Sequence, residues 1–134
     1  MWRVRAGILA LVIVCSTAQA SNWWNIDKSY DGTMETFIDV SSLRIAGNIR
    51  RAWYKTAYKT HTQKGDDGKY WSYTVSKKAF NCTEEMFRDE AGIIYFEDGT
   101  NFTVSAEIYP TPWVPVPPDT VASLSMHFIC AMKR

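Results

Sequence analysis

Two histidines and three cysteines are the side chains with the clearest chemical potential in this sequence. A nucleophile–base pair needs a Ser or Cys beside a His that a carboxylate orients. His61 falls at the end of a predicted strand and His127 falls inside a predicted helix, and no recognised catalytic or phosphate-binding motif is present. We therefore expect His127 to lie at the margin of the packed face of its helix, and we expect that the protein is not an enzyme.

Paired carboxylates are the other candidates for acid–base chemistry. They occur at Asp66-Asp67, Glu84-Glu85 and Asp89-Glu90. Each pair lies in a turn-like or polar segment, where a solvated face is the ordinary interpretation and a glycosidase-type pair is the alternative. The histidines also show no ligand spacing with the cysteines, so no metal site and no cofactor are expected.

Residues 1–20 have the three parts of a secretory signal peptide. A positively charged start precedes an apolar run over residues 6–14, which is far shorter than the roughly 20 residues that span a bilayer. A stretch of small residues then ends at Ala20. We predict cleavage after Ala20, which leaves residues 21–134 as one domain in the periplasm, on the cell surface or outside a bacterium.

Cleavage at this position would leave two cysteines, Cys82 and Cys130. In an oxidising compartment two cysteines most simply form a disulfide, and a metal site or a reactive thiol is the alternative. Cys15 would leave with the signal unless it were the acylated residue of a lipoprotein. Val14 argues against acylation, because lipoprotein signals have a small residue at that place.

The charge balance argues against nucleic acid as a partner. The whole sequence has 15 basic and 14 acidic residues, and losing Arg3 and Arg5 leaves 13 basic residues against 14 acidic ones. A nucleic-acid surface needs a clearly basic face, which this balance does not provide. No segment after the signal is apolar enough to be a predicted membrane span.

Turn signals divide the mature chain into runs rich in aromatic and β-branched residues. The predicted strands cover residues 23–27, 37–40, 48–61, 70–80, 90–96 and 101–108, with a single helical turn at 41–44. Residues 97–100 give the strongest hairpin signal. In the arm that follows, Phe102, Val104, Ala106 and Ile108 alternate with polar residues, so we expect them on a buried face.

Five prolines between Pro110 and Pro118 predict an extended crossover rather than a sheet strand, because proline lacks a backbone N–H. A Pro-rich ligand for a partner's groove is the alternative. Asp119 or Thr120 then caps a helix. Its expected buried stripe consists of Val121, Leu124, Phe128 and Ile129. The predicted fold is α+β: a meandering antiparallel sheet of about six strands, with a C-terminal helix packed on one face and one disulfide.

The strand predicted over residues 48–61 carries a candidate binding patch. Alternation places Arg51, Trp53, Lys55 and Lys59 on one face of it. If this face meets water, it is a basic and aromatic surface suited to an acidic protein, a glycan or a sulfated polymer. The alternative is a tryptophan shielded by the aliphatic stems of its basic neighbours.

Taken in order, these features resemble those of one bacterial family. They are a strand ending in Ile38-Asp39, the turn Ser42-Leu43-Arg44, Trp53, Phe80-Asn81-Cys82, Arg88, Tyr95, Gly99, Trp113, Pro115, Pro117, Pro118 and Cys130. From about Trp23 to Cys130 the chain resembles the surface-adhesin protein E-like domain. The resemblance implies a sheet with a flanking helix tied by a Cys82–Cys130 bridge, and adhesion to host extracellular-matrix proteins. The namesake of the family is a lipoprotein, whereas this signal predicts ordinary cleavage.

The predicted function is therefore that of an exported, non-enzymatic and adhesin-like binding module, with an extracellular or envelope protein as its partner. The alternative is a periplasmic small-molecule carrier or an envelope-stress accessory protein, in which aromatic side chains line a pocket. An enclosed apolar cavity favours the carrier. Joint exposure of Trp53, Lys55 and Lys59 favours the binding module.

Overall fold

The computed structural model describes residues 20–133, so the predicted signal peptide lies outside the described residues except for Ala20. In chain order the described elements are β1 (Trp23–Lys28), β2 (Met34–Ala46), β3 (Ile49–Tyr58), β4 (Trp71–Asn81), β5 (Met86–Phe96), β6 (Asn101–Thr103), β7 (Val114–Pro115) and α1 (Val121–Ala131). Among these elements no helix is long and apolar enough to cross a membrane.

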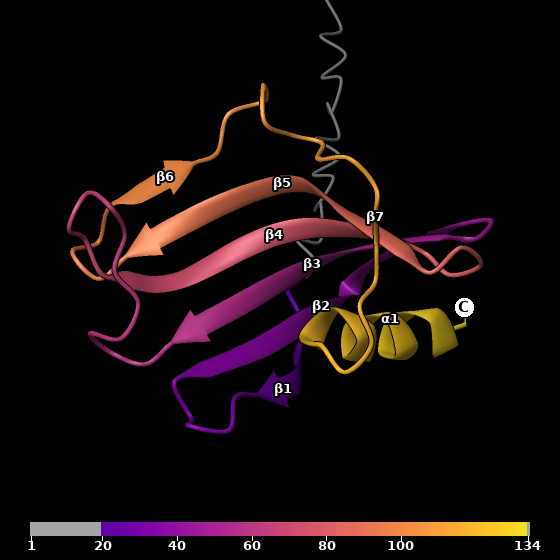
Figure 1. Cartoon of the computed structure of the whole chain (residues 1–134), viewed down its shortest axis with the longest axis horizontal. Coiled ribbons are helices and arrows are strands. Elements are labelled where there is room, and N and C mark those ends of the chain that lie inside the picture. The colour runs from indigo at the N-terminus through magenta and orange to yellow at the C-terminus, as the bar shows by residue number, and fades with distance from the viewer. Residues whose placement is uncertain (1–19, 134) are drawn as a thin grey trace, which may run out of the picture.

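The strands form one antiparallel sheet in which β1 to β6 lie side by side in chain order (Figure 1). The two-residue strand β7 pairs with β5 at the end of β5 that β6 leaves free. Gly47 and Gly99 supply the positive φ angles, 58° and 85°, that the tight β2–β3 and β5–β6 turns require. The helix α1 follows at the C-terminal end and packs on the sheet, so the predicted α+β class is confirmed.

The helical turn predicted at residues 41–44 is wrong, because β2 continues through this segment. The register of β2 against β3 shifts between Asp39 and Arg44, which marks a bulge. The buried Asp39 carboxylate accepts hydrogen bonds from the backbone N–H groups of Asn22 and Ser41 and from the Ser41 hydroxyl. These local side-chain bonds account for the turn-like composition of the segment within a continuous strand.

The strand predicted over residues 101–108 is also shorter than expected. β6 ends at Thr103, and Phe102 and Ile108 are exposed rather than buried. Beyond β6 the Tyr109 side chain packs closely against Gly92 of β5. A Cβ atom at position 92 would lie only 2.8 Å from the Tyr109 hydroxyl oxygen. The alternating pattern therefore belongs to a chain that leaves the sheet after three residues.

The Pro-rich segment, predicted to be an extended crossover outside the sheet, contributes a strand of two residues. Val114 and Pro115 form β7 and pair with Phe87 and Met86 of β5. An edge position tolerates this, because proline's missing N–H then faces away from the ladder.

The core lies between α1 and the face of the sheet that the helix covers. Its buried members are Ile38, Leu43, Ala52, Tyr54, Phe80, Met126 and Ile129. Thr120 caps the helix as one of the two predicted residues, and its hydroxyl accepts from the Ser123 N–H at 3.2 Å.

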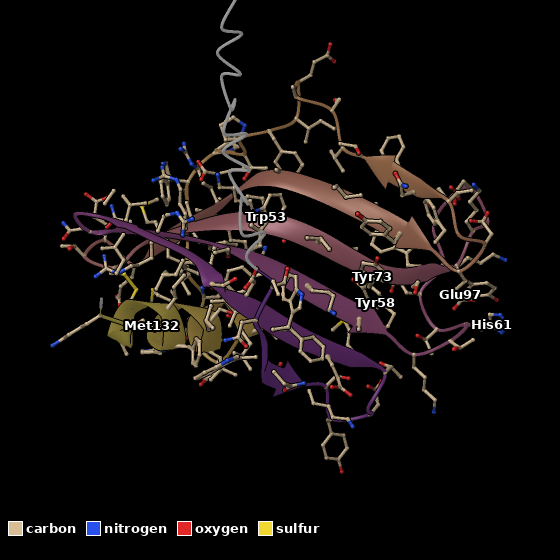
Figure 2. The ribbon with its side chains drawn as sticks, turned by 180° about the vertical axis from the view of Figure 1, so that it is seen from behind. Trp53, Tyr58, His61, Tyr73, Glu97 and Met132 are labelled. Atoms are coloured by element: carbon tan, nitrogen blue, oxygen red, sulfur yellow. A yellow bond between two sulfur atoms is a disulfide. The ribbon has the colours of Figure 1, made fainter. Side chains whose placement is uncertain are left out.

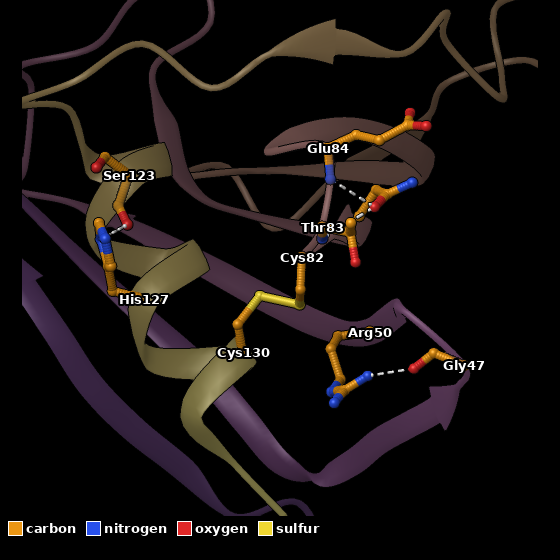
Figure 3. Close-up of a disulfide and its surroundings, with 9 residues drawn as sticks. Gly47, Arg50, Cys82, Thr83, Glu84, Ser123, His127 and Cys130 are labelled. Carbon is orange, nitrogen blue, oxygen red and sulfur yellow. Dashed lines mark hydrogen bonds between the residues drawn. A yellow bond between two sulfur atoms is a disulfide. The ribbon is translucent and has the colours of Figure 1, made fainter.

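The buried stripe of α1 is only partly the predicted one. Ser125, Met126 and Ile129 are buried, whereas Val121 and Leu124 are exposed. The rotation of the helix is set by Cys130, which forms a disulfide with Cys82 just after β4 (Figure 3). Met126 and Ile129 lie four residues and one residue before Cys130 and so face the sheet with it. The predicted Cys82–Cys130 bridge is confirmed.

Candidate binding surface

Alternate side chains of β3 point to opposite faces of the sheet. Ala52 and Tyr54 are buried beneath α1, whereas Trp53 and Lys55 point to the other face, which Figure 2 shows from behind. Among residues 20–133 no second layer of helix or sheet packs on it. We call it the open face. Its larger side chains are Trp23, Phe37, Arg51, Trp53, Lys55, Tyr73, Val75, Lys77, Ile93 and Tyr95.

Lys55 lies at the centre of an aromatic cluster on the open face. Its Nζ is 5.0 Å from the ring centroid of Trp23, 5.2 Å from that of Phe37 and 6.0 Å from that of Tyr73. Tyr73 in turn stacks on Tyr95 at 4.4 Å. Cation–π attraction holds the ammonium group among these rings. In the described part of the chain Lys55 forms no ion pair, so its charge stays available to a partner.

Arg51 is the member of the predicted patch that already has a partner. Its Nε donates to Glu90 Oε1 at 2.6 Å, and the Arg88 guanidinium donates to the other Glu90 oxygen at 3.1 Å. The Arg88 guanidinium also lies 4.7 Å from the ring centroid of Trp113. One carboxylate thus joins two arginines at the β5 edge of the open face.

The pair Asp89-Glu90 is not the solvated pair that the sequence suggests. The two acids are adjacent in β5 and point to opposite faces of the sheet. The register of β5 against β4 shifts between the partners of Lys77 and Lys78, and this shift leaves Glu90 without a partner on β4. Asp89 forms a 2.6 Å ion pair with Lys78 on the helix side, while Glu90 binds Arg51 on the open face.

The Glu90 network gives a stability prediction. Glu90→Gln is expected to lower the free energy of unfolding by about 1–3 kcal/mol, because two half-buried guanidinium groups lose their shared counter-charge. Urea denaturation measures this loss. Glu35→Gln is the matched control, since Glu35 pairs with the exposed Lys28 at 3.5 Å and should cost less than about 0.5 kcal/mol. Equal small losses for both variants would contradict the role assigned to Glu90.

The structure brings Trp53 and Lys55 together but separates them from Lys59. Trp53 is half-buried among its neighbours, and Lys59 is exposed one residue beyond the end of β3. Six residues of extended chain separate Trp53 from Lys59 by roughly 20 Å. Sequence reasoning did not include Trp23, Phe37 and Tyr73 in the patch, since only the strand register brings them beside Lys55.

The two histidines have different surroundings. His61 Nε2 lies 3.1 Å from Glu97 at the loop end of the sheet, where its ring contacts Tyr70 (Figure 2). His127 is exposed rather than at the margin of the packed face, and its Nδ1 is 2.8 Å from the Ser123 carbonyl oxygen (Figure 3). The described residues contain no group of three His, Cys, Asp or Glu side chains that could hold a metal ion.

The fold and its surfaces define an α+β domain whose single described helix is bridged to one face of an antiparallel sheet. Residues 23–131 match the family described as Surface-adhesin protein E, and the chain therefore belongs to this family. No curated protein gives a significant match.

Solved structures of Haemophilus influenzae protein E have a similar fold. The selenomethionine form has a TM-score of 0.57 at 16% identity, over 80% of this chain and 85% of that chain. A second form has a TM-score of 0.56 at 16% identity, over 80% and 83%. Protein E from non-typeable Haemophilus influenzae has a TM-score of 0.51 at 16% identity, over 86% and 79%. At this identity the similarity shows the fold.

Proposed function

We propose that this protein is an exported, non-enzymatic binding module of the bacterial envelope, with an adhesin-like role, and that its open face contacts an extracellular or envelope protein. The observation that carries the proposal is the position of the Lys55 ammonium, which lies among three aromatic rings on a sheet face that no described element covers. It has no ion-pair partner among residues 20–133. Membership of the Surface-adhesin protein E family supports the adhesin-like role.

The charges of the open face favour an acidic partner. Glu90 is shared by two arginines, and Glu35 is bound to Lys28, so these carboxylates are neutralised within the chain. Lys55 and Lys77 form no ion pair in the part of the chain that the structure describes. The face thus keeps spare positive charge although the mature chain is nearly neutral. Aromatic rings around a cation suit an interface in which charge sets specificity and rings supply buried area.

Binding measurements test the open face directly. Lys55→Gln/Lys77→Gln is expected to weaken binding to immobilised, purified extracellular-matrix proteins by roughly tenfold, because both spare charges are lost. The control is Lys64→Gln/Lys133→Gln, which removes the same charge away from the open face. Equal binding by the two double variants would refute the proposed surface. Absence of binding by the unmodified protein would refute the adhesin-like role.

Display on the cell surface is a separate expectation, which follows from the adhesin-like role. Cell fractionation with protease treatment of intact cells distinguishes the surface, the periplasm and the medium. Protein protected inside the periplasm would contradict adhesion and favour the carrier or accessory role.

A further inference from the structure

A row of threonines crosses the helix side of the sheet. Thr36 of β2 pairs with Thr56 of β3, and Thr56 pairs with Thr74 of β4. Their side chains point to the face that carries α1, because Ile38 and Tyr54, two residues away on the same strands, belong to the core. Figure 1 shows that the helix lies over only one end of this face. The threonine row therefore lies beside the first turns of the helix rather than beneath its middle.

The row forms the floor of a groove made of two adjoining hollows. The first, of about 250 Å³, lies between α1 and strands β2 to β5 and is lined by Thr36 and Thr56. The second, of about 200 Å³, lies over β4 and β5 and is lined by Thr74 and Ser76. Tyr58 lines both hollows, which therefore adjoin. Three strand spacings separate β2 from β5, so the groove is roughly 14 Å long. We call it the threonine groove.

Hydroxyl groups of the threonine groove are available to a ligand. Thr36, Thr56 and Ser76 form no side-chain hydrogen bond within residues 20–133. In the described chain, the fully buried side-chain nitrogen and oxygen atoms that have no partner belong to two arginines and Tyr54. The unpaired hydroxyls of the groove are therefore in contact with solvent, where a ligand can reach them.

Aromatic rings form one wall of the threonine groove. Tyr58 and Trp71 meet edge to face at 5.9 Å between ring centroids, and the side chain of Tyr58 is hydrogen-bonded to that of Thr74. Tyr109 lies at the β5 end of the groove, packed against Gly92. These contacts hold the rings in place, so the wall is formed before any ligand binds. Such a wall suits a ligand that has an apolar face.

The charges of the lining favour a neutral ligand. Among the described residues, Lys78 and Asp89 are the only charged side chains that line the two hollows, and they bind each other at 2.6 Å. An ion would therefore find no spare counter-charge. A wholly apolar ligand is also unsuitable, because it would bury the groove hydroxyls without partners. The lining thus matches a neutral ligand that has both polar groups and an apolar face.

A saccharide matches the threonine groove better than a peptide does. A peptide that binds a sheet gains main-chain hydrogen bonds at an edge strand. The strands β2, β3 and β4 are interior strands, and their backbone groups are already paired with their neighbours. The floor offers side-chain hydroxyls instead, and each of them both donates and accepts, as the hydroxyls of a sugar do. The C–H groups on the face of a sugar ring are apolar and can pack on an aromatic wall.

We propose that the threonine groove binds a neutral oligosaccharide, with its hydroxyls bonded to Thr36, Thr56 and Ser76 and its ring faces packed on Tyr58 and Trp71. Engineered cavities of about 150 Å³ take up benzene, so each hollow has room for one six-membered ring with its substituents. The groove lies on the helix side of the sheet, and it is independent of the binding proposed for the open face. The two faces of the sheet then serve different partners.

Nuclear magnetic resonance titration of the ¹⁵N-labelled mature domain tests the site. The probes are maltotriose, cellotriose and triacetylchitotriose, which are neutral trisaccharides that differ in linkage and substituents. At least one of them is expected to shift the amide signals of Thr56, Thr74 and Ala122 and to leave that of Trp23 unchanged. An uncharged hexapeptide of glycine and serine with blocked ends is the comparison ligand, and it should shift none of these signals at the same concentration.

Thr56→Val removes one hydroxyl of the floor and keeps the shape of the side chain. This variant is expected to bind the best trisaccharide about tenfold more weakly, because a sugar hydroxyl loses its partner. The matched control is Thr103→Val on β6, which makes the same change at an exposed position outside the groove and should bind within twofold of the original value. Valine suits a strand, so both variants should keep the amide spectrum of the core.

Tyr58→Leu tests the aromatic wall separately and is also expected to weaken binding by about tenfold. Three results would overturn the proposal: no amide shifts with any of the trisaccharides at millimolar concentration, equal affinity of Thr56→Val and the unmodified domain, or shifts with the hexapeptide as large as those with the best trisaccharide. The last result would assign the groove to a peptide.

Discussion

Replacing Cys82 and Cys130 together by alanine is expected to lower the free energy of unfolding by about 4 kcal/mol. The two cysteines are 48 residues apart, and the bridge restricts the unfolded chain over this whole loop. A small domain has a total stability of about 5–15 kcal/mol, so the loss is a large share of it. Urea denaturation of the double variant, beside the oxidised domain, measures the change.

The position of the bridge adds a local effect to the loss of stability. The helix buries only Ser125, Met126 and Ile129, and the disulfide holds its last turn against the end of β4. We therefore expect amide hydrogens of α1 to exchange faster in the double variant than those of β3. The oxidised domain treated with a reductant is the control and should behave like the double variant. An unchanged unfolding midpoint in both samples would rule out a stabilising bridge.

The sheet could be predicted because its signals are local. Alternating side chains and glycine turns mark β3, β4 and the β5–β6 hairpin, and strand order follows from short connections. The bulge after Asp39 could not be predicted, since it depends on hydrogen bonds to a carboxylate from residues on both sides of it. Residues 41–44 have a turn-like composition for this reason, although they belong to β2.

The open face could be predicted only within one strand. Alternation correctly places Trp53 and Lys55 on the same side of β3, because period two is an intrinsic property of a strand. Trp23, Phe37 and Tyr73 come from β1, β2 and β4, and they reach Lys55 through the pairing register. Lys55 pairs with Phe37 of β2 and with Val75 of β4, and this register depends on contacts between strands rather than on the local composition of β3.

A recess on the helix side of the sheet, between α1 and strands β2 to β5, depends on the rotation of α1 about its axis. It exists because the covered face of the sheet extends beyond the first turn of α1, where Ala122 and Ser125 form one wall. The rotation of α1 is set by the Cys130 bridge, which also leaves Leu124 exposed. The spacing of apolar residues along the sequence contains no information on this rotation and therefore predicts a buried Leu124.

Truncation of two phenylalanines on the sheet should have very different effects on the free energy of unfolding. Phe80 is 0% exposed and contacts the rings of Tyr54 and Phe87, at 6.0 Å and 5.9 Å between centroids. Phe80→Ala removes these contacts and leaves a cavity, so we expect a loss of about 3–5 kcal/mol in the free energy of unfolding. Phe102 lies on β6 and is 56% exposed, and Phe102→Ala should change the free energy of unfolding by less than about 0.5 kcal/mol.

The effects of Phe80→Ala and Phe102→Ala together show whether Phe102 is exposed, as in the structure, or buried, as the alternating pattern predicts. The alternating pattern of residues 101–108 predicts that Phe102 is buried, in which case its truncation would also cost several kcal/mol. In the structure β6 ends at Thr103 and no described element covers the Phe102 ring. Urea denaturation of the two variants at equal protein concentration therefore decides the matter. A loss at Phe102 comparable with that at Phe80 would mean that the segment after β6 packs over the sheet in solution.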